Sequence, residues 1–341
     1  MKTNAGRFFE DYRLGEVIAH AVPRTVSGGE RALYHALYPA RHALYSSDLF
    51  AQGCGLPASP LDDLIAFHTV FGKTVPDVSL NAVANLGYGE GRWLAPVWPG
   101  DTLRSESTVI GLKQNSNGQS GVVYVRTQGI NQHGQAVLDY VRWVMVKKRD
   151  FAAPAPEAVV PDLAKVVDPA TLVIPKGLDF SRYDFALAGE AHRMGDYAVG
   201  EVIDHVDGVT IEEAEHMLAT RLWQNTAKVH FDATQRPDGR RLIYGGHVIS
   251  LARALSFNGL ANAQMLVALN AGAHANPCFA GDTVRAWSEV LDTAETAAPG
   301  VGAIRLRLVA TKGGAGDLRA ADGKYLPEVL LDLDYWALMP V

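Results

Sequence analysis

The two halves of this 341-residue chain repeat each other. Three segments of the first half recur in the second half in the same order. The pairs are Asp11–His20 with Asp196–His205, Ser27–Glu30 with Thr210–Glu213, and Pro96–Arg104 with Pro277–Arg285. The two copies start 185, 183 and 181 residues apart, as their numbers show. This conserved order and spacing indicate an internal duplication. A length above the roughly 250–300 residues at which single cores stop growing also predicts two domains.

A proline-rich segment separates the repeats. It contains five of the chain's prolines, at positions 154, 156, 161, 169 and 175, among alanine and valine. Such a composition predicts an extended linker with little regular structure of its own. We therefore expect an N-terminal domain over residues 1–150, a linker over 151–190 and a C-terminal domain over 191–341.

Each half carries the pattern of a buried helix followed by alternating strands. Ser27–Glu30 and Thr210–Glu213 have the spacing of capping boxes that open helices. The apolar spacing predicts further helical segments at Ser59–Phe71, Thr210–Leu222 and Gly246–Phe257. Strands are predicted at Asp101–Leu112, Gly121–Gln128, Ala136–Lys147, Met265–Ala273, Asp282–Leu291, Ile304–Thr311 and Val329–Leu338. A central helix with an antiparallel sheet, occurring twice, belongs to the α+β class.

Composition excludes several functions. The net charge is −6 with no long basic run, so nucleic acid and anionic membrane surfaces are poor partners. Cys54 and Cys278 lie far apart and outside any CxxC spacing, so a reducing, cytoplasmic location is expected. We find no signal peptide and no apolar run approaching the ~20 residues of a membrane span. No glycine-rich nucleotide loop, HExxH motif or metal-ligand cluster is present, which predicts no metal or redox cofactor.

The strongest candidate for chemistry is the segment Asn-x-x-x-Val-His-x-Asp, which places Asn225, His230 and Asp232 close together. Ionisable side chains are rarely buried without partners. An imidazole titrates near neutral pH, so His230 could serve as an acid–base group, or it could be a structural histidine. Asn225 could hold a water or orient His230. Asp232 could take part in catalysis or cap a helix.

This segment resembles the signature of the MaoC-like hot-dog hydratases, usually Asp-x-Asn-Pro-Leu-His-x-Asp, and the resemblance covers essentially the whole chain. It implies a tandem (double) hot-dog fold, with two antiparallel sheets that each wrap a central helix. It also implies that His230 is the acid–base group. The family's usual aspartate is replaced here by Asn225, which cannot exchange a proton. Either His230 works alone, or a carboxylate such as Asp232 takes that role.

The resemblance further implies that the N–H of Gly246 stabilises the thioester oxygen as charge develops on it. Glycine allows a close backbone approach, and the N-terminus of a helix favours negative charge. A simple tight turn is the alternative explanation for the Gly245-Gly246 pair. In the first half, neither plausible alignment gives His-x-Asp. We therefore expect one active cleft per chain, with the N-terminal domain shaping the acyl-CoA cleft.

Several basic residues are candidates for substrate binding. Arg240 and Arg241 could bind the phosphates of coenzyme A, as could Lys147, Lys148 and Arg149, or these could be solvated surface residues. Lys228 and Arg253 are the candidates for a distal carboxylate, although either could pair with an acidic neighbour. From the first half, Arg41 and His42 remain candidates, with a solvated helix end as the alternative.

The activity that the resemblance implies is the reversible hydration of mesaconyl-CoA to β-methylmalyl-CoA in the ethylmalonyl-CoA pathway. The only cofactor-like group would be the coenzyme A of the acyl-CoA thioester itself, and a homodimer is conceivable. The alternatives are a broader (R)-specific 2-enoyl-CoA hydratase and a non-catalytic acyl-CoA sensor, which the missing aspartate would permit. An acyl-CoA thioesterase on the same fold is a more distant alternative.

Overall fold

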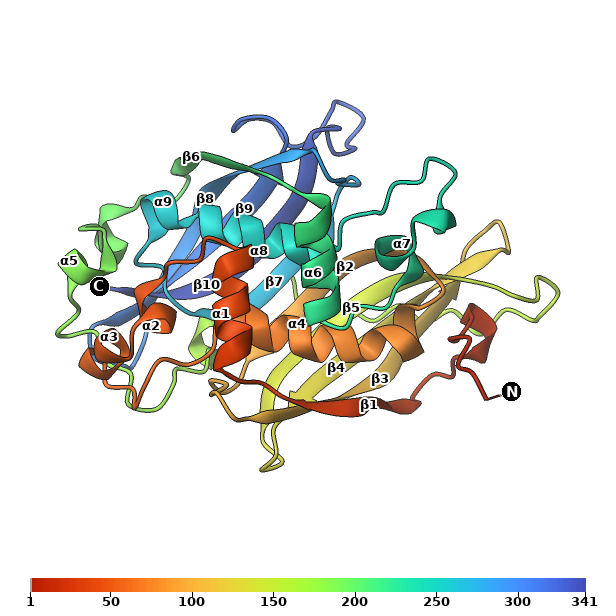
Figure 1. Cartoon of the computed structure of the whole chain (residues 1–341), viewed down its shortest axis with the longest axis horizontal. Coiled ribbons are helices and arrows are strands. Elements are labelled where there is room, and N and C mark those ends of the chain that lie inside the picture. The colour runs from red at the N-terminus through yellow and green to blue at the C-terminus, as the bar shows by residue number, and fades with distance from the viewer. Residues whose placement is uncertain (1) are drawn as a thin grey trace.

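A single ten-stranded antiparallel sheet organises the protein (Figure 1), which is described by a computed structural model covering residues 2–341. The order is β1-β3-β4-β5-β2-β7-β10-β9-β8-β6, so each half contributes five strands arranged in the same way. The strands are β1 (Val17–Thr25), β2 (Ala82–Trp93), β3 (Thr102–Gln114), β4 (Ser120–Ile130), β5 (Ala136–Lys147), β6 (Val202–Thr210), β7 (Leu266–His274), β8 (Thr283–Glu295), β9 (Val301–Thr311) and β10 (Val329–Pro340). This confirms the predicted α+β class and the duplication.

The two halves are joined edge to edge by β2 and β7, in a way the sequence did not predict. Their register pairs Tyr88 with Gly272 and Arg92 with Ala268, so two expected sheets form one. We did not predict β2 as a strand, because three glycines interrupt its alternation. At Gly91 an added Cβ would lie 2.7 Å from the Cβ of Leu269 on β7. The absence of a side chain at this position therefore allows the two strands to approach closely.

One long helix from each half lies against the same face of the sheet: α4 (Asp63–Thr74) and α8 (Gly245–Leu255) (Figure 1). Helix α4 starts later than predicted, because the Asp62 carboxylate accepts a hydrogen bond from Leu64 N and caps it. Helix α8 ends earlier than predicted. It is followed by the short α9 (Phe257–Leu260), which contains non-helical backbone at Asn258 and Gly259.

Shorter helices cover the ends of these two. The Ser27 capping box is confirmed, because Ser27 and Glu30 cap α1 (Gly28–Leu37) as predicted. The Thr210 cap was wrong: Thr210 ends β6, and Glu212 precedes α6 (Glu213–Leu222). Other short helical elements within the two halves are η1 (Phe9–Asp11), α2 (Ala43–Ser46), α3 (Asp48–Gly53), η2 (Val75–Ser79), α7 (Lys228–Phe231) and η5 (Ala233–Gln235).

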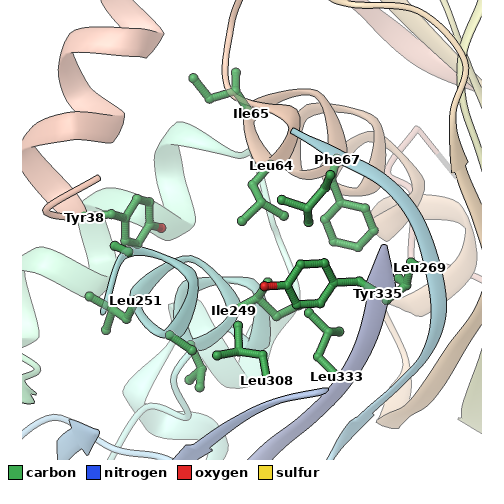
Figure 2. Packing of buried hydrophobic residues seen from close by; sticks show 14 of the residues in the cluster. Tyr38, Leu64, Ile65, Phe67, Ile249, Leu251, Leu269, Leu308, Leu333 and Tyr335 are labelled. Carbon is green, nitrogen blue, oxygen red and sulfur yellow. The ribbon is translucent and has the colours of Figure 1, made fainter. Parts of the chain in front are cut away.

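The main hydrophobic core is shared between the halves. Leu64 and Phe67 of α4 belong to the same buried cluster as Ile249 and Leu251 of α8 and Leu333 of β10 (Figure 2). Burial of such side chains is the main favourable term in folding. The central helices therefore stabilise both halves together.

The segment between the halves crosses the surface with little regular structure. Its helical pieces are η3 (Pro169–Thr171), α5 (Phe185–Ala188) and η4 (Met194–Asp196). Leu178, Phe180 and Tyr183 bury their side chains in a second cluster with Tyr45 and Trp336. Within residues 2–341, no helix is long and apolar enough to cross a bilayer.

Candidate active site

A cavity of about 440 Å³ lies between the two halves and is lined by residues of both. The first half contributes the end of α4, η2, β2 and β5. The second half contributes the segment 225–230, the start of α8 and the end of β7. This location brings the predicted motif residues Asn225, Lys228 and His230 to one wall of the cavity.

The single turn α7 holds His230 in place. Leu242 fixes this turn twice, since its N–H donates to the Val229 carbonyl at 2.9 Å and its carbonyl accepts from His230 Nδ1 at 2.8 Å. Because a carbonyl only accepts, Nδ1 carries the proton, and Nε2 of the neutral ring is left with a lone pair.

The electrostatics of His230 favour the neutral form. Burial lowers the pKa of His230 to about 4, although its hydrogen bond to Leu242 acts in the opposite direction. The ring lies 6.0 Å from that of Tyr244, centroid to centroid. Within the described chain, no residue forms a hydrogen bond with Nε2. This arrangement suits a general base at the cavity wall.

Asn225 is buried and lines the cavity close to His230. Its Oδ1 accepts a hydrogen bond from Ala227 N at 3.1 Å, which shapes the backbone that leads into α7. No described residue accepts from its Nδ2. The amide therefore has one fixed end and one free donor beside the cavity, which suits the positioning of a water.

Asp232 does not line the cavity. Its carboxylate accepts from Thr234 N at 2.9 Å, from Thr234 Oγ1 at 2.7 Å and from Gln235 Nε2 at 2.8 Å, and it caps η5. These hydrogen bonds lower the pKa of the Asp232 carboxyl, and the bonds from Thr234 have the largest effect. This geometry matches the capping role rather than contact with substrate.

The start of α8 borders the cavity at Gly245. Gly246 lies one residue further in, where an added Cβ would meet the Tyr244 ring at 2.4 Å. The N-cap residue Tyr244 makes no side-chain capping bond. Backbone N–H groups at this helix end are therefore available for a developing negative charge.

The residues of the cavity wall that the sequence analysis missed include Asn85, Tyr88, Arg142 and His274. His274 Nε2 lies 3.1 Å from the Tyr88 hydroxyl, and burial lowers the pKa of His274 to about 4. Tyr88 lies on the unpredicted strand β2, and His274 lies just beyond the end of the strand predicted at Met265–Ala273. For Arg142 the available signal was a charge within the apolar run Val141–Val146.

The predicted substrate-binding cations are dispersed. Lys228 is exposed and lines the cavity. Arg253 is buried outside its lining, where it donates to Ser256 Oγ at 3.0 Å and to the backbone carbonyls of residues 263 and 264. Arg240 lies over the Phe279 ring, and Arg241 pairs with Glu213; neither lines the cavity.

The first-half candidates occupy a different region. The Arg41 guanidinium lies 4.5 Å from the centroid of the Phe257 ring, and the His42 ring is buried beside that same ring. Arg41 and Phe257 border a separate hollow of about 730 Å³. Tyr45, which a shift of 185 residues places opposite His230, packs with Leu44 and Phe50 in a hydrophobic cluster. Apolar side chains thus occupy the equivalent place.

Within residues 2–341, no group of three or more histidine, cysteine, aspartate or glutamate side chains is arranged to hold a metal ion.

Comparison with known proteins identifies the family. The family model described as mesaconyl-CoA hydratase matches residues 2–315. A mesaconyl-CoA hydratase of Cereibacter sphaeroides is 81% identical over the full length of both chains. A beta-methylmalyl-CoA dehydratase of Chloroflexus aurantiacus is 58% identical over 99% of this chain and 98% of its own length.

Solved structures agree. A putative MaoC domain protein dehydratase from Chloroflexus aurantiacus superposes with a TM-score of 0.95 at 56% identity, covering 100% of this chain and 99% of its own. A Mycobacterium tuberculosis protein described as a double hotdog fold has a TM-score of 0.76 at 26% identity, covering 98% of each chain. The chain is thus a MaoC-like double hot-dog protein and belongs to the mesaconyl-CoA hydratase family.

Proposed function

We propose that this protein is a hydro-lyase that reversibly hydrates mesaconyl-CoA to β-methylmalyl-CoA, as the names of its relatives suggest. The observation that carries the proposal is the neutral His230, whose Nδ1 is fixed to Leu242 and whose Nε2 is left free at the cavity. An unprotonated imidazole that lines a cavity can remove a proton from water near neutral pH.

The reaction can be balanced with the chain's own groups. His230 Nε2 takes a proton from water as its oxygen bonds to C3, and the C2–C3 π electrons move to the thioester oxygen. Backbone N–H groups of Gly245 and Gly246 stabilise that enolate. The imidazolium then returns the proton to C2 as the carbonyl re-forms. Because one group serves both steps, the proton and the hydroxyl add to the same face of the double bond.

Asn225 has a positioning role in this scheme. Its free Nδ2 donates to the attacking water, while its Oδ1 remains bound to Ala227 N. An amide cannot replace the proton-exchanging aspartate of related hydratases, and Asp232 is engaged in capping. The acid–base work therefore falls on His230 alone.

We propose that exposed cations at the cavity rim bind the phosphates of coenzyme A. Lys147, at the end of β5, and Lys228 both line the cavity and are exposed. Charge-assisted hydrogen bonds to phosphate are about twice as strong as neutral ones. Arg240 and Arg241 lie further away and would act, if at all, through long-range attraction.

The remaining features follow from the same scheme. No step calls for a cofactor, since the coenzyme A is part of the substrate. One cleft per chain is proposed, because the equivalent place in the other half is filled. A cytoplasmic location and a homodimer stay predictions, and light scattering of the purified chain would establish the oligomeric state.

The test is the loss of the conjugated enoyl-thioester absorbance when mesaconyl-CoA is mixed with the enzyme. We expect His230→Ala to lower kcat by at least about 100-fold, the lower range of general-base contributions. The control is His133→Ala, which changes an exposed histidine in the turn after β4. Wild-type activity in His230→Ala, or hydration without syn geometry in D2O, would contradict the mechanism.

A further inference from the structure

Arg142 is a buried cation that the proposed reaction does not yet use. It lies on β5 with none of its surface exposed to solvent, yet it is part of the cavity wall. Only its Nη2 has a partner, the Thr74 hydroxyl at 2.7 Å. Its Nε and Nη1 form no hydrogen bond with any described residue. An arginine keeps its charge at every physiological pH, so this site retains a buried charge that no carboxylate neutralises.

A buried charge without a partner is costly, and proteins keep such groups where a ligand completes them. The Phe71 ring, 4.3 Å from the guanidinium carbon, offsets part of the cost by a cation–π contact. That contact leaves two of the guanidinium nitrogens, Nε and Nη1, without a hydrogen-bond acceptor. A guanidinium fork with free N–H groups matches the two oxygens of a carboxylate.

A second unsatisfied polar group lies beside it. Asn85 on β2 lines the same cavity, and both its Nδ2 and its Oδ1 are buried without partners. In the β2–β5 register Asn85 stands opposite Val144, two residues along the strand from Arg142. Residues so placed share one face of the sheet and are diagonal neighbours, within reach of long side chains.

The other half shows that the fold does not need an arginine here. Asp139, Arg142 and Trp143 on β5 correspond to Asp332, Tyr335 and Trp336 on β10, with the same spacing. Tyr335 points into the packed core near Leu333 (Figure 2) and is fully buried there. A ring therefore fills this position where no cavity exists, and the cation is found in the half whose strands border the cavity.

Arg142 also stands at a suitable place relative to His230. Tyr244 packs against His230 at 6.0 Å and against Phe71 at 5.9 Å, centroid to centroid, and Phe71 in turn contacts Arg142. Lys147 is five residues further along β5, or about 17 Å at the usual strand rise. The buried and the rim cation are thus too far apart to bind one small anion together.

We propose that Arg142, with Asn85, binds the distal carboxylate of the acyl group and selects dicarboxylic enoyl-CoA substrates over uncharged ones. This proposal rests on the proposed hydratase function. It assigns binding of the distal carboxylate to Arg142 and Asn85 in place of Lys228 and Arg253. Arg253 donates its hydrogen bonds to the Ser256 hydroxyl and to backbone carbonyls, and Lys228 is exposed at the cavity rim.

The test compares kcat/KM on mesaconyl-CoA and on crotonyl-CoA, which lacks the carboxylate. We expect Arg142→Met to lower the ratio of the two values by about 10- to 100-fold, the range of a hydrogen bond to a charged group. Arg142→Lys keeps the charge without the fork and should give a smaller drop. Asn85→Asp supplies an internal carboxylate to Arg142 and should also lower the ratio.

Arg126→Met is the matched control. It removes an arginine from the adjacent strand β4, where Arg126 is ion-paired with Asp139 and does not line the cavity. The ratio of the two kcat/KM values should therefore stay at its wild-type value. If Arg142→Met fails to fold, the substrate ratios of Arg142→Lys and Asn85→Asp test the proposal. A binding measurement adds a readout independent of turnover: wild-type protein should bind methylsuccinyl-CoA more tightly than butyryl-CoA, and Asn85→Asp should reduce that preference.

Unchanged substrate ratios in the folded Arg142 and Asn85 variants would overturn this assignment while leaving the hydratase function intact. A wild-type chain that hydrates neither thioester would instead overturn the proposed function. In that case, a preference for methylsuccinyl-CoA that is lost in Asn85→Asp would still support the carboxylate site.

Discussion

At the scale of single residues, His230 has a protonation behaviour that can be measured. Its pKa is lowered to about 4, chiefly by burial, from the ordinary value of about 6.5. The basic form is therefore already fully populated well below neutral pH. We expect kcat/KM to show no acid inflection near pH 6.5 and to fall only as the pH approaches 4. A profile measured on crotonyl-CoA, with folding checked at each pH, tests this; an inflection between pH 6 and 7 would refute it.

Asn225 provides a second prediction at this scale. If its amide positions water, Asn225→Ala should lower kcat by about 10-fold or more while KM changes little, because one hydrogen bond is lost mainly from the attacking nucleophile. Asn225→Asp restores a group that can exchange a proton and should retain or increase turnover of ordinary enoyl-CoA substrates. Steady-state kinetics of both variants decide. Wild-type kcat and KM in both would remove Asn225 from the site.

The sequence was informative for some of these residues and not for others, for a physical reason. Asn225 and His230 lie on one short segment, so local spacing alone predicted that they are close together. Arg142 and His274 come from β5 and β7, and their meeting with His230 depends on how the two halves pair. Arg253 showed the same charge-in-an-apolar-run signal as Arg142, but its partners are the carbonyls of its own surroundings.

At the scale of elements, a helix of one half supports the segment of the other half that carries the proposed catalytic residues. Helix α4 passes Trp223 so closely that an added Cβ on Gly72 would lie 1.7 Å from the Trp223 carbonyl oxygen. Trp223 is buried and lies two residues before Asn225, the first residue of the motif. The close approach of α4 thus fixes the backbone that leads to Asn225 and His230.

We therefore expect Gly72→Ala to destabilise the fold by about 1–3 kcal/mol, as overpacking does, and to lower kcat by displacing the motif. Gly53→Ala is the control, since a Cβ at this position in α3 would meet nothing within 4 Å. Chemical denaturation gives the free energy of unfolding, and hydration kinetics give kcat. Wild-type values of both in Gly72→Ala would show that the contact is not restrictive.

Element boundaries were predicted well where pattern and chemistry agreed. Strand β5 was predicted with both ends correct, because it begins just after the turn at Asn131–Gly134 and ends just before the proline-rich segment. Strand β2 was missed, because its glycines serve the packing against Leu269 and Trp143 instead of a local pattern. Strands β1 and β6, which form the two edges of the sheet, were not predicted either, so periodicity missed the edge strands as well as a strand that joins the halves.

At the scale of the whole molecule, the two halves of the sequence are not expected to unfold as separate units. The sheet is continuous through β2 and β7, and one buried cluster contains α4 of the first half and α8 of the second. A half unfolded by itself would leave its partner with an open sheet edge and an exposed core face. Both are unfavourable in water, so partial unfolding should not be populated.

The prediction is one cooperative unfolding transition for the full chain, followed by far-UV circular dichroism, tryptophan fluorescence and calorimetry. Two variants sharpen it: Leu112→Ala, in a cluster formed by the first half alone, and Leu308→Ala, on β9 in the second. Each removes a buried leucine and should cost about 2–5 kcal/mol. If the halves unfold together, either variant lowers the midpoint of the single transition seen by all probes, and the calorimetric and van't Hoff enthalpies agree. If they unfold independently, each variant shifts only one of two transitions and leaves the other at its wild-type midpoint.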